Sequence, residues 1–295
     1  MLRRKRTDRL TGISMRGALL AVNLLAFTIA LLLLWKSWPV LSGQPIQDVL
    51  FSTTWHPTQG QFGYLAFIVG TVAVTVLAMA LAVPVCLLSA LCISEYLPGR
   101  LRWPVRLAVD VMAGIPSVLY GLLGILIIVP WVHQLGSYFG RDGSGYSLLA
   151  GGIVLGLMVT PVIISVAVEV LQGVPRDARE AALSLGTTKW EVSLRVVARH
   201  AWRGLMSAVV LGFARAFGET MAVLMVVGND ARIPTSLFDR VYPIPALIAN
   251  NYGEMMSIPL YDSALLLGAL LLMLVVGGFN LAAHVMLARS EPGRA

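Results

Sequence analysis

Long apolar runs without a charged residue are the feature that most constrains how this chain can fold. Five such runs occur, and a sixth, given last, carries two charged residues: 17–35, 65–94, 111–132, 148–168, 263–287 and 204–227. A bilayer core is about 30 Å thick, so a helix needs about 20 apolar residues to cross it. A helix also satisfies its own backbone hydrogen bonds, which lipid cannot do. The sequence therefore predicts an all-α polytopic membrane protein with six transmembrane helices.

The composition and the charge distribution favour a membrane protein over a nucleic-acid-binding protein. Hydrophobic residues make up 57% of the 295 residues and charged residues 13%, and the formal net charge is +7. Soluble chains typically hold about 25% charged residues. With the amino terminus inside, 17 Lys and Arg residues fall in predicted cytoplasmic segments and four fall outside. This asymmetry predicts a multi-pass protein of the bacterial inner membrane with both termini in the cytoplasm, and it explains the positive charge without nucleic acid.

The expected organisation has three parts. Residues 1–16 form a basic cytoplasmic amino terminus, residues 17–290 form the transmembrane domain, and residues 291–295 form a cytoplasmic tail. The longest predicted cytoplasmic segment inside the domain covers residues 172–204. Three turn-rich loops are predicted to face outward: 39–64, 133–147 and 228–262.

No residue pattern indicates catalysis or a metal site. Cys86 and Cys92 lie in one apolar run, which supports neither a disulfide framework nor a metal site. The four His residues are scattered, and the sequence holds no Gly-Lys pair for a phosphate-binding Walker A loop. We therefore expect no catalytic residue, no metal and no cofactor on this chain, with any ATP hydrolysis on a partner subunit.

The segment 172–204 has the pattern of a helix, a break and a second helix. Pro175 suits the first turn of a helix, and Asp177 and Glu180 favour the positive end of the helix dipole. Gly186 can take the positive φ of a helix end. These features predict a short amphipathic helix on the cytoplasmic surface. From physical chemistry alone, it is either a solvated connector at the lipid headgroups or an element that couples to another protein.

A resemblance separates these two interpretations. The motif Glu180-Ala181-Ala182, followed by Gly186, resembles the EAA signature of the permeases of ABC importers. The resemblance implies a type I ABC importer permease architecture, in which this short helix docks on a separate ATPase. The two alanines would permit close helix approach, and Glu180 could form a charged contact. Gly186 would let the chain turn back.

Charged residues inside the predicted membrane domain are candidates for the substrate pathway. Arg215 and Glu219 are four residues apart, so a continuous helix would place them on one face, with Thr220 beside them. A charge near the bilayer centre costs at least about 2.5–3.5 kcal/mol. The pair is either a buried salt bridge that sets helix packing or a site where Arg215 binds an oxyanion and Glu219 accepts its proton. We interpret Asp110 and Glu169, near cytoplasmic helix ends, as structural.

The residues around Arg215 narrow the resemblance. The stretch from Arg215 to Val223, with Gly228-Asn229 after it, resembles phosphate-system permeases, particularly their PstC branch. The resemblance covers about residues 60–290. It implies a second related permease, an ATPase dimer and an extracytoplasmic phosphate-binding protein as partners, in addition to membrane lipid. Three alternatives remain open: a permease for sulfate or molybdate, a carrier driven by an ion gradient, and a sensor or scaffold that reports phosphate supply to a phosphate-sensing kinase system.

A proline in the third apolar run predicts an irregular helix. Pro116 removes a backbone hydrogen bond, and Ser117 can compensate locally. This motif either kinks the helix near the pathway or belongs to ordinary close packing through Gly114, Gly121 and Gly124.

Overall fold

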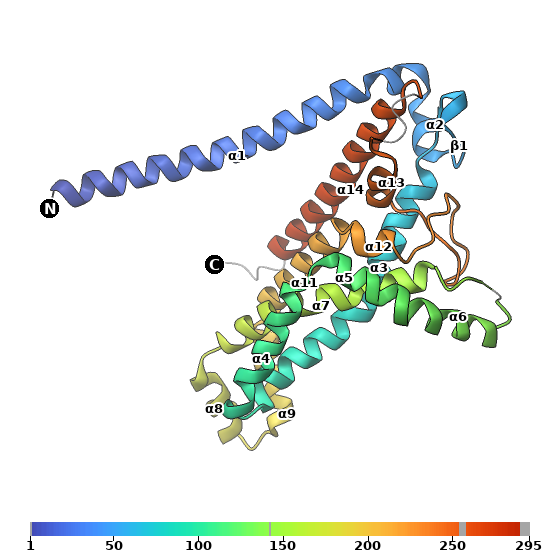
Figure 1. Ribbon diagram of the computed structural model, residues 1–295. Helices are drawn as coiled ribbons and strands as arrows, with labels where there is room; N and C mark the ends of the chain where they lie inside the picture. The colour runs from blue at the N-terminus through green and yellow to red at the C-terminus, as the bar shows by residue number, and fades with distance from the viewer. Residues whose placement is uncertain (1, 142, 254–257, 290–295) are drawn as a thin grey trace.

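The computed structural model describes residues 2–141, 143–253 and 258–289 and is predominantly helical (Figure 1). The predicted tail at residues 291–295 lies outside the described residues. The long helices are α1 (Leu2–Gly43), α3 (Leu65–Leu91), α4 (Gly99–Gly114), α7 (Leu148–Gln172), α11 (Trp202–Phe217) and α14 (Tyr261–Arg289). The shorter elements are α2 (Ile46–Phe51), β1 (Trp55–His56), η1 (Pro57–Gln59), β2 (Gln61–Phe62), η2 (Cys92–Tyr96), α5 (Ser117–Leu123), η3 (Gly124–Ile128), α6 (Val129–Tyr138), α8 (Arg176–Ser184), α9 (Lys189–Glu191), η4 (Val192–Val197), α10 (Ala198–His200), α12 (Met221–Leu224) and α13 (Ile244–Asn251). The all-α prediction is confirmed, apart from a hairpin of two-residue strands.

Among the described residues, five helices are long and apolar enough to cross a membrane. They are Ser14–Gly43, Leu65–Tyr96, Ser117–Tyr138, Leu148–Gln172 and Tyr261–Met286. These helices coincide with five of the predicted runs, although the third begins at Ser117 rather than at residue 111. The sixth predicted run is divided, because α11 ends at Phe217 and α12 covers only Met221–Leu224. The run at residues 204–227 therefore does not form one continuous helix.

The main core lies where α3 and α7 pack along each other, with α11 and α12 against them. Small residues on α7 allow this close approach. A Cβ added at Gly152 would lie 2.7 Å from the Leu77 side chain, and one at Gly156 would lie 3.2 Å from the carbonyl oxygen of Ala78. Membrane helices gain their association energy from such contacts, since lipid tails are as apolar as the side chains. The α3–α7 pair is consequently the rigid part of the fold.

A second core lies at the end of the molecule opposite to α8 and α9 (Figure 1). The strands β1 and β2, α2, α13 and the adjoining ends of α1, α3 and α14 enclose it. Trp55 is its aromatic centre, with ring centroids 4.8 Å from Phe67 and 5.4 Å from Phe62. The Tyr64 hydroxyl donates to the carbonyl of Ala264 at 2.5 Å. This core holds the predicted outward loop at residues 39–64 against α14.

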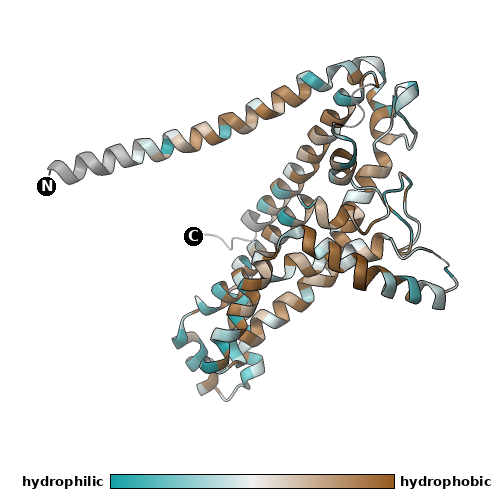
Figure 2. Cartoon of the chain, in the orientation of Figure 1, coloured by the Kyte–Doolittle hydropathy of each residue, from teal (hydrophilic) through white to brown (hydrophobic). Residues whose placement is uncertain are grey.

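Helix α1 leaves the body of the molecule as a long arm (Figure 1). Only its carboxyl-terminal part packs on α14, where Ser37 and Val40 are buried. Between Met15 and Trp35 the helix is mostly apolar (Figure 2) and most of its large apolar side chains are exposed, and none of the most apolar 18-residue window of Ser14–Gly43 is buried. The helix also continues through Pro39 to Gly43, beyond the predicted end at residue 35, because Val40 packs into the second core.

Candidate functional site

The segment 172–204, which is predicted to be cytoplasmic, folds as the helix-break-helix pattern predicts. Pro175 immediately precedes α8, and Gly186 follows its end with φ +77°. The next helix begins with a capping box, in which the Thr188 hydroxyl accepts from the Glu191 backbone N–H at 3.3 Å and the Glu191 carboxylate accepts from the Thr188 backbone N–H at 3.0 Å. Reciprocal bonds of this kind satisfy two backbone donors at a helix start. The segment is therefore an ordered pair of helices joined by a tight turn.

Arg179 attaches α8 to the ends of two membrane helices. Its guanidinium forms a two-pronged ion pair with Glu95 of η2, with Nε to Oε2 at 3.1 Å and Nη2 to Oε1 at 2.9 Å. It also donates to the carbonyls of Leu171, at 2.8 Å, and Val174, at the end of α7. The Arg179 side chain is 18% exposed and the Glu95 side chain 9%. A planar guanidinium suits this arrangement, because its donors form a rigid fork.

Other contacts fix the acceptor end of this ion pair. The Ser94 hydroxyl donates to Glu95 Oε1 at 2.9 Å, and Arg102 Nη2 donates to the carbonyls of Ser94 and Leu97. The Lys189 ammonium lies 4.8 Å from the centroid of the Tyr96 ring, a cation–π contact. These contacts therefore fix α8 directly to the adjoining ends of α3 and α7. The sequence analysis missed Arg179 and Glu95, because they are 84 residues apart.

The predicted coupling residues divide between the two faces of α8. Glu180 and Ala181 are exposed, whereas Ala182 is half-buried and packs against the main core. Apolar side chains nearby are also exposed, namely Leu185 at 84% and Trp190 at 52%. The segment thus presents a mixed acidic and apolar surface outward while Arg179 holds its inner face.

The predicted pair of Arg215 and Glu219 does not share a helical face, so that expectation is wrong. Helix α11 ends at Phe217, between the two residues, because the chain breaks at Gly218. Glu219 Oε1 instead accepts from the backbone N–H of Ala222 at 3.2 Å and so caps α12. Among the residues that the structure describes, no ion pair joins Arg215 to Glu219. Arg215 is exposed, and Glu219 and Thr220 are half-buried.

The predicted kink at Pro116 and Ser117 is a complete break. Helix α4 ends at Gly114 and α5 begins at Ser117, with Pro116 as its N-cap residue. The Tyr120 hydroxyl donates at 2.8 Å to the carbonyl of Met112 near the end of α4, which also accepts from the Ile115 backbone N–H at 3.3 Å. Two polar ends of helices therefore replace a bent helix. Proline explains this, because it disfavours a helical conformation in the residue before it.

The two breaks meet in space, although about 100 residues separate them in the sequence. Helices α5 and α12 pack together, and a Cβ at Gly121 would lie 2.7 Å from the sulfur of Met225 and 3.2 Å from Ala222 Cα. Close packing therefore holds at Gly121. It also holds at Gly124, where a Cβ would lie 2.7 Å from Val154. A Cβ at Gly114 would meet nothing within 4 Å.

Glu219 borders a small cavity of about 10 Å³ that the hydroxyl-bearing residues Thr71 and Thr75 also line. Thr71 Oγ1 accepts from the backbone N–H of Ile244 at 2.9 Å, and the Thr75 hydroxyl donates to the Thr71 carbonyl at 2.8 Å. This volume is about the minimum that admits one water molecule. The cavity is therefore too small for an oxyanion, which could reach Glu219 only from outside it.

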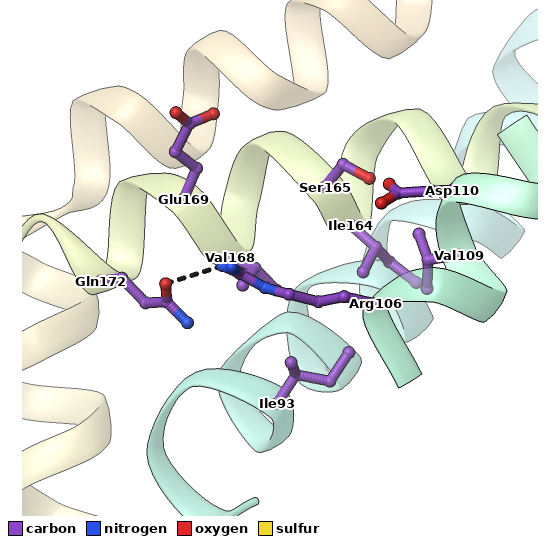
Figure 3. Close-up of a pocket in the computed structure, with 9 residues that line it drawn as sticks. All are labelled: Ile93, Arg106, Val109, Asp110, Ile164, Ser165, Val168, Glu169 and Gln172. Carbon is purple, nitrogen blue, oxygen red and sulfur yellow. Dashed lines mark hydrogen bonds between the residues drawn. The ribbon is translucent and has the colours of Figure 1, made fainter. Parts of the chain in front are cut away.

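Asp110 and Glu169 lie in a polar cavity of about 360 Å³ between α4 and α7 (Figure 3). Arg106 extends along this cavity and donates to the Gln172 side-chain oxygen at 2.7 Å. Figure 3 shows the two carboxylates at different places on its wall rather than paired with each other. Arg106 lines the same cavity as both acidic residues, but its guanidinium bonds to Gln172, and among the described residues no ion pair joins it to either carboxylate. The interpretation of Asp110 and Glu169 as structural stays a prediction.

These features define a polytopic membrane protein in which a short helix pair is attached to the ends of the core helices. Residues 82–293 match the family model described as binding-protein-dependent transport system inner membrane component. The chain belongs to this family. The members of the family are transport subunits rather than enzymes, and multiple apolar helices agree with an inner-membrane location.

Curated relatives match over nearly the whole chain. A "Phosphate transport system permease protein PstC" of Xylella fastidiosa is 36% identical, over 98% of this chain and 93% of the relative. A protein of the same name from Haemophilus influenzae is 33% identical, over 93% of this chain and 90% of the relative. Among solved structures, a bacterial ABC transporter involved in alginate import has a TM-score of 0.56 at 18% identity, covering 96% of this chain and 99% of that one. This last likeness concerns the fold alone.

Proposed function

We propose that this chain is the membrane-spanning permease subunit of an ATP-driven inorganic phosphate importer. The observation that carries the proposal is 36% identity to a phosphate permease over 98% of the chain. Glu180 and Ala181 are exposed on a helix that is bound to the core. They support the proposal, because an importer needs a docking surface for its ATPase. The chain itself provides a path and the coupling segment, and ATP binds to the partner.

Coupling follows from the contacts of α8. Closure of an ATPase dimer would displace the exposed face that carries Glu180. The Arg179–Glu95 ion pair and the bond to the Leu171 carbonyl would transmit that displacement to α3 and α7. Because α11 and α12 pack on this helix pair, the region around Arg215 would move with it. The result is alternating access driven from the cytoplasmic side.

A second, related permease would complete the path. The α1 arm leaves its apolar side chains exposed, and Arg215 is open on the surface of this chain. Lipid suits the apolar residues but not an exposed guanidinium. A second subunit would therefore cover Arg215, while lipid and this subunit would share α1. In this proposal both termini face the cytoplasm. A phosphate-binding protein delivers the substrate on the outer side of the membrane. A phosphate-sensing kinase system responds to the conformational state of the transporter.

Radiolabelled phosphate uptake tests the proposal, in cells that lack this chain and at low external phosphate. Cells are complemented with the wild type, Glu180→Lys or Arg215→Ala, and Ser184→Ala on α8 serves as the matched control. We expect ATP-dependent uptake with the wild type and the control and loss of uptake with the other two variants, at equal membrane abundance. Uptake that persists after ATP depletion would indicate an ion-gradient carrier. Wild-type uptake of sulfate or molybdate in place of phosphate would reassign the substrate.

A further inference from the structure

A polar pocket of about 350 Å³ lies apart from Arg215, between the two later loops that are predicted to face outward. Ser144 and Tyr146 line it from one loop. Gly228, Asn229 and Arg240 line it from the other, at the point where the chain leaves α12. We call it the vestibule pocket. Its walls carry a guanidinium, two hydroxyl-bearing side chains and an amide.

Arg240 is the only cationic residue of this pocket, and its charge is not neutralised by the neighbouring acids. Its Nη2 donates to Ser144 Oγ at 2.9 Å, and among the described residues it has no carboxylate partner. Asp239 is engaged elsewhere, since it accepts from the backbone N–H and the hydroxyl of Thr235 and lies 3.9 Å from Arg141. A guanidinium has five N–H donors. Arg240 can therefore donate to an anion while it holds Ser144.

Asn229 contributes an acceptor that nothing in the described chain satisfies. Its Oδ1 is buried and has no hydrogen-bond partner, while its Nδ2 donates to the carbonyl of Leu224 at 3.1 Å. That bond fixes the orientation of the amide, because exchanging O and N would place two acceptors together. A buried acceptor without a donor is costly. The amide oxygen is thus prepared for a hydrogen-bond donor.

The backbone holds these groups in place. Gly228 has φ +86°, and a Cβ there would lie 2.7 Å from Arg240 Cγ, so the arginine stem lies directly over the glycine. An isolated bridge pairs Gly228 with Val241, and the Val241 N–H donates to the Val227 carbonyl at 3.1 Å. Asn229 follows in the left-handed region at φ 51°. Arg240 and Asn229 are therefore fixed relative to each other by main-chain contacts.

We propose that the vestibule pocket is an entry site for a tetrahedral oxyanion that carries a proton, namely hydrogen phosphate. Arg240 donates to its oxygens, and Ser144, which accepts from Arg240, donates its own proton to the anion. The anion's hydroxyl donates to Asn229 Oδ1. Sulfate carries no proton at neutral pH and would leave that oxygen unpaired, which is how sites reject analogues that lack one donor. The proposal rests on the proposed function, because phosphate is its substrate.

Binding to the assembled permease–ATPase complex in lipid nanodiscs, without binding protein, tests the site. The probe is radiolabelled inorganic phosphate, with sulfate and arsenate as competitors. Arsenate resembles hydrogen phosphate in carrying a proton. We expect arsenate, but not sulfate, to displace phosphate from the wild type. Arg240→Ala should weaken phosphate binding at least about tenfold, because it removes charge-assisted bonds.

Asn229→Gly tests the selectivity, since glycine keeps the left-handed backbone and removes the amide. We expect sulfate to displace phosphate from this variant as well as arsenate does. Arg232→Ala is the matched control, because Arg232 lies in the same loop but pairs with Asp230 at 3.5 Å. It should bind as the wild type does. Sulfate displacement from the wild type, or unchanged binding in Arg240→Ala, would overturn the proposal.

Uptake by complemented cells separates this proposal from the proposed function. If the wild type restores no phosphate uptake, the proposed function fails. If the wild type restores uptake while Arg240→Ala and Asn229→Gly match it in uptake and binding, only the entry site fails. If Arg240→Ala lowers uptake but leaves phosphate binding intact, Arg240 contacts a carboxylate of the binding protein instead, and the entry site is wrong.

Discussion

Two arginines of this chain, Arg179 and Arg215, lie in opposite environments. Arg179 at the cytoplasmic end is paired with Glu95 through both prongs of its guanidinium and bonded to two carbonyls, and its side chain is only 18% exposed. Arg215, in the membrane domain, is exposed and forms no ion pair with its expected partner Glu219. The first arrangement ties α8 to the ends of α3 and α7, whereas the second leaves a charged group exposed on the surface of the chain.

This difference shows that the role of a charged residue in an apolar chain cannot be inferred until its partner is known. A buried ion pair is weak support for net stability, because desolvation offsets the attraction. Its geometry nevertheless joins α8 to α3 and α7. Among the described residues, no such ion pair ties Arg215 to another helix. Arg240 in the vestibule pocket likewise has no carboxylate partner there.

The largest expected effect comes from breaking the paired side of this comparison. Arg179→Ala would leave Glu95 buried without its partner, which typically costs about 3–5 kcal/mol, and we expect about 3 kcal/mol because the pair is slightly exposed. Equilibrium unfolding of the purified full chain in detergent measures this loss. The exchange of both charges, Glu95→Arg with Arg179→Glu, should recover part of it. A change below about 0.5 kcal/mol in Arg179→Ala would contradict the anchoring role.

Steric fit rather than charge holds the two helix breaks together, and a glycine substitution sharpens this contrast. Gly121→Val would push against Met225 and Ala222, and overpacking typically costs about 1–3 kcal/mol. Gly114→Val is the matched control, since a Cβ there meets nothing within 4 Å. The same unfolding measurement compares them. Equal losses in both variants would show that α5 and α12 do not pack as described.

Arg215→Ala tests the unpaired side. We expect the free energy of unfolding to change by no more than about 0.5 kcal/mol, as for most surface substitutions. Phosphate uptake should be lost at the same time. Lost transport with retained stability is the opposite of the result expected for a structural ion pair, whose loss lowers stability. Strong destabilisation would mean that Arg215 has a partner within the chain, and the comparison with Arg179 would no longer hold.

The smallest effect concerns pH and the capping box that starts α9. The backbone N–H and the hydroxyl of Thr188 donate to Glu191 and lower the pKa of its carboxyl group below the ordinary value of 4.5. Because the pKa is lower in the folded state, the stabilising contribution is present above the unfolded pKa. It is lost as the pH falls through the folded pKa. Amide hydrogen exchange at residues 188–192 should therefore show faster opening below about pH 4.

Thr188→Ala is the control for this prediction. It removes the hydroxyl that bonds to Glu191, so the pH at which exchange accelerates should move up toward the ordinary carboxyl pKa. An unchanged pH profile would show that the capping box does not set the titration of Glu191. Thr188 precedes α9 and does not contact Arg179 of α8, so the anchoring of α8 should remain.

The outcome of the sequence analysis depended on whether a feature is local. The helix before Gly186 was predicted correctly, because proline, acidic residues and glycine act within a few residues of their positions. The shared face of Arg215 and Glu219 was wrong, because the spacing argument assumes a continuous helix. Gly218 was a signal that the helix could end there. Pro116 was likewise a signal for a break, since Ile115 before it adopts an extended conformation at ψ 127°.

The sequence by itself determined the membrane class, most of the apolar spans and the short helix before Gly186, because each follows from the composition and the order of neighbouring residues. Tertiary structure alone decided which charges are paired. Glu95 and Arg179 meet only when α3, α7 and α8 are packed together, and no local pattern records that distance. The physical reason is that ion pairing and desolvation depend on separation in space, whereas apolar length and helix capping depend on separation along the chain.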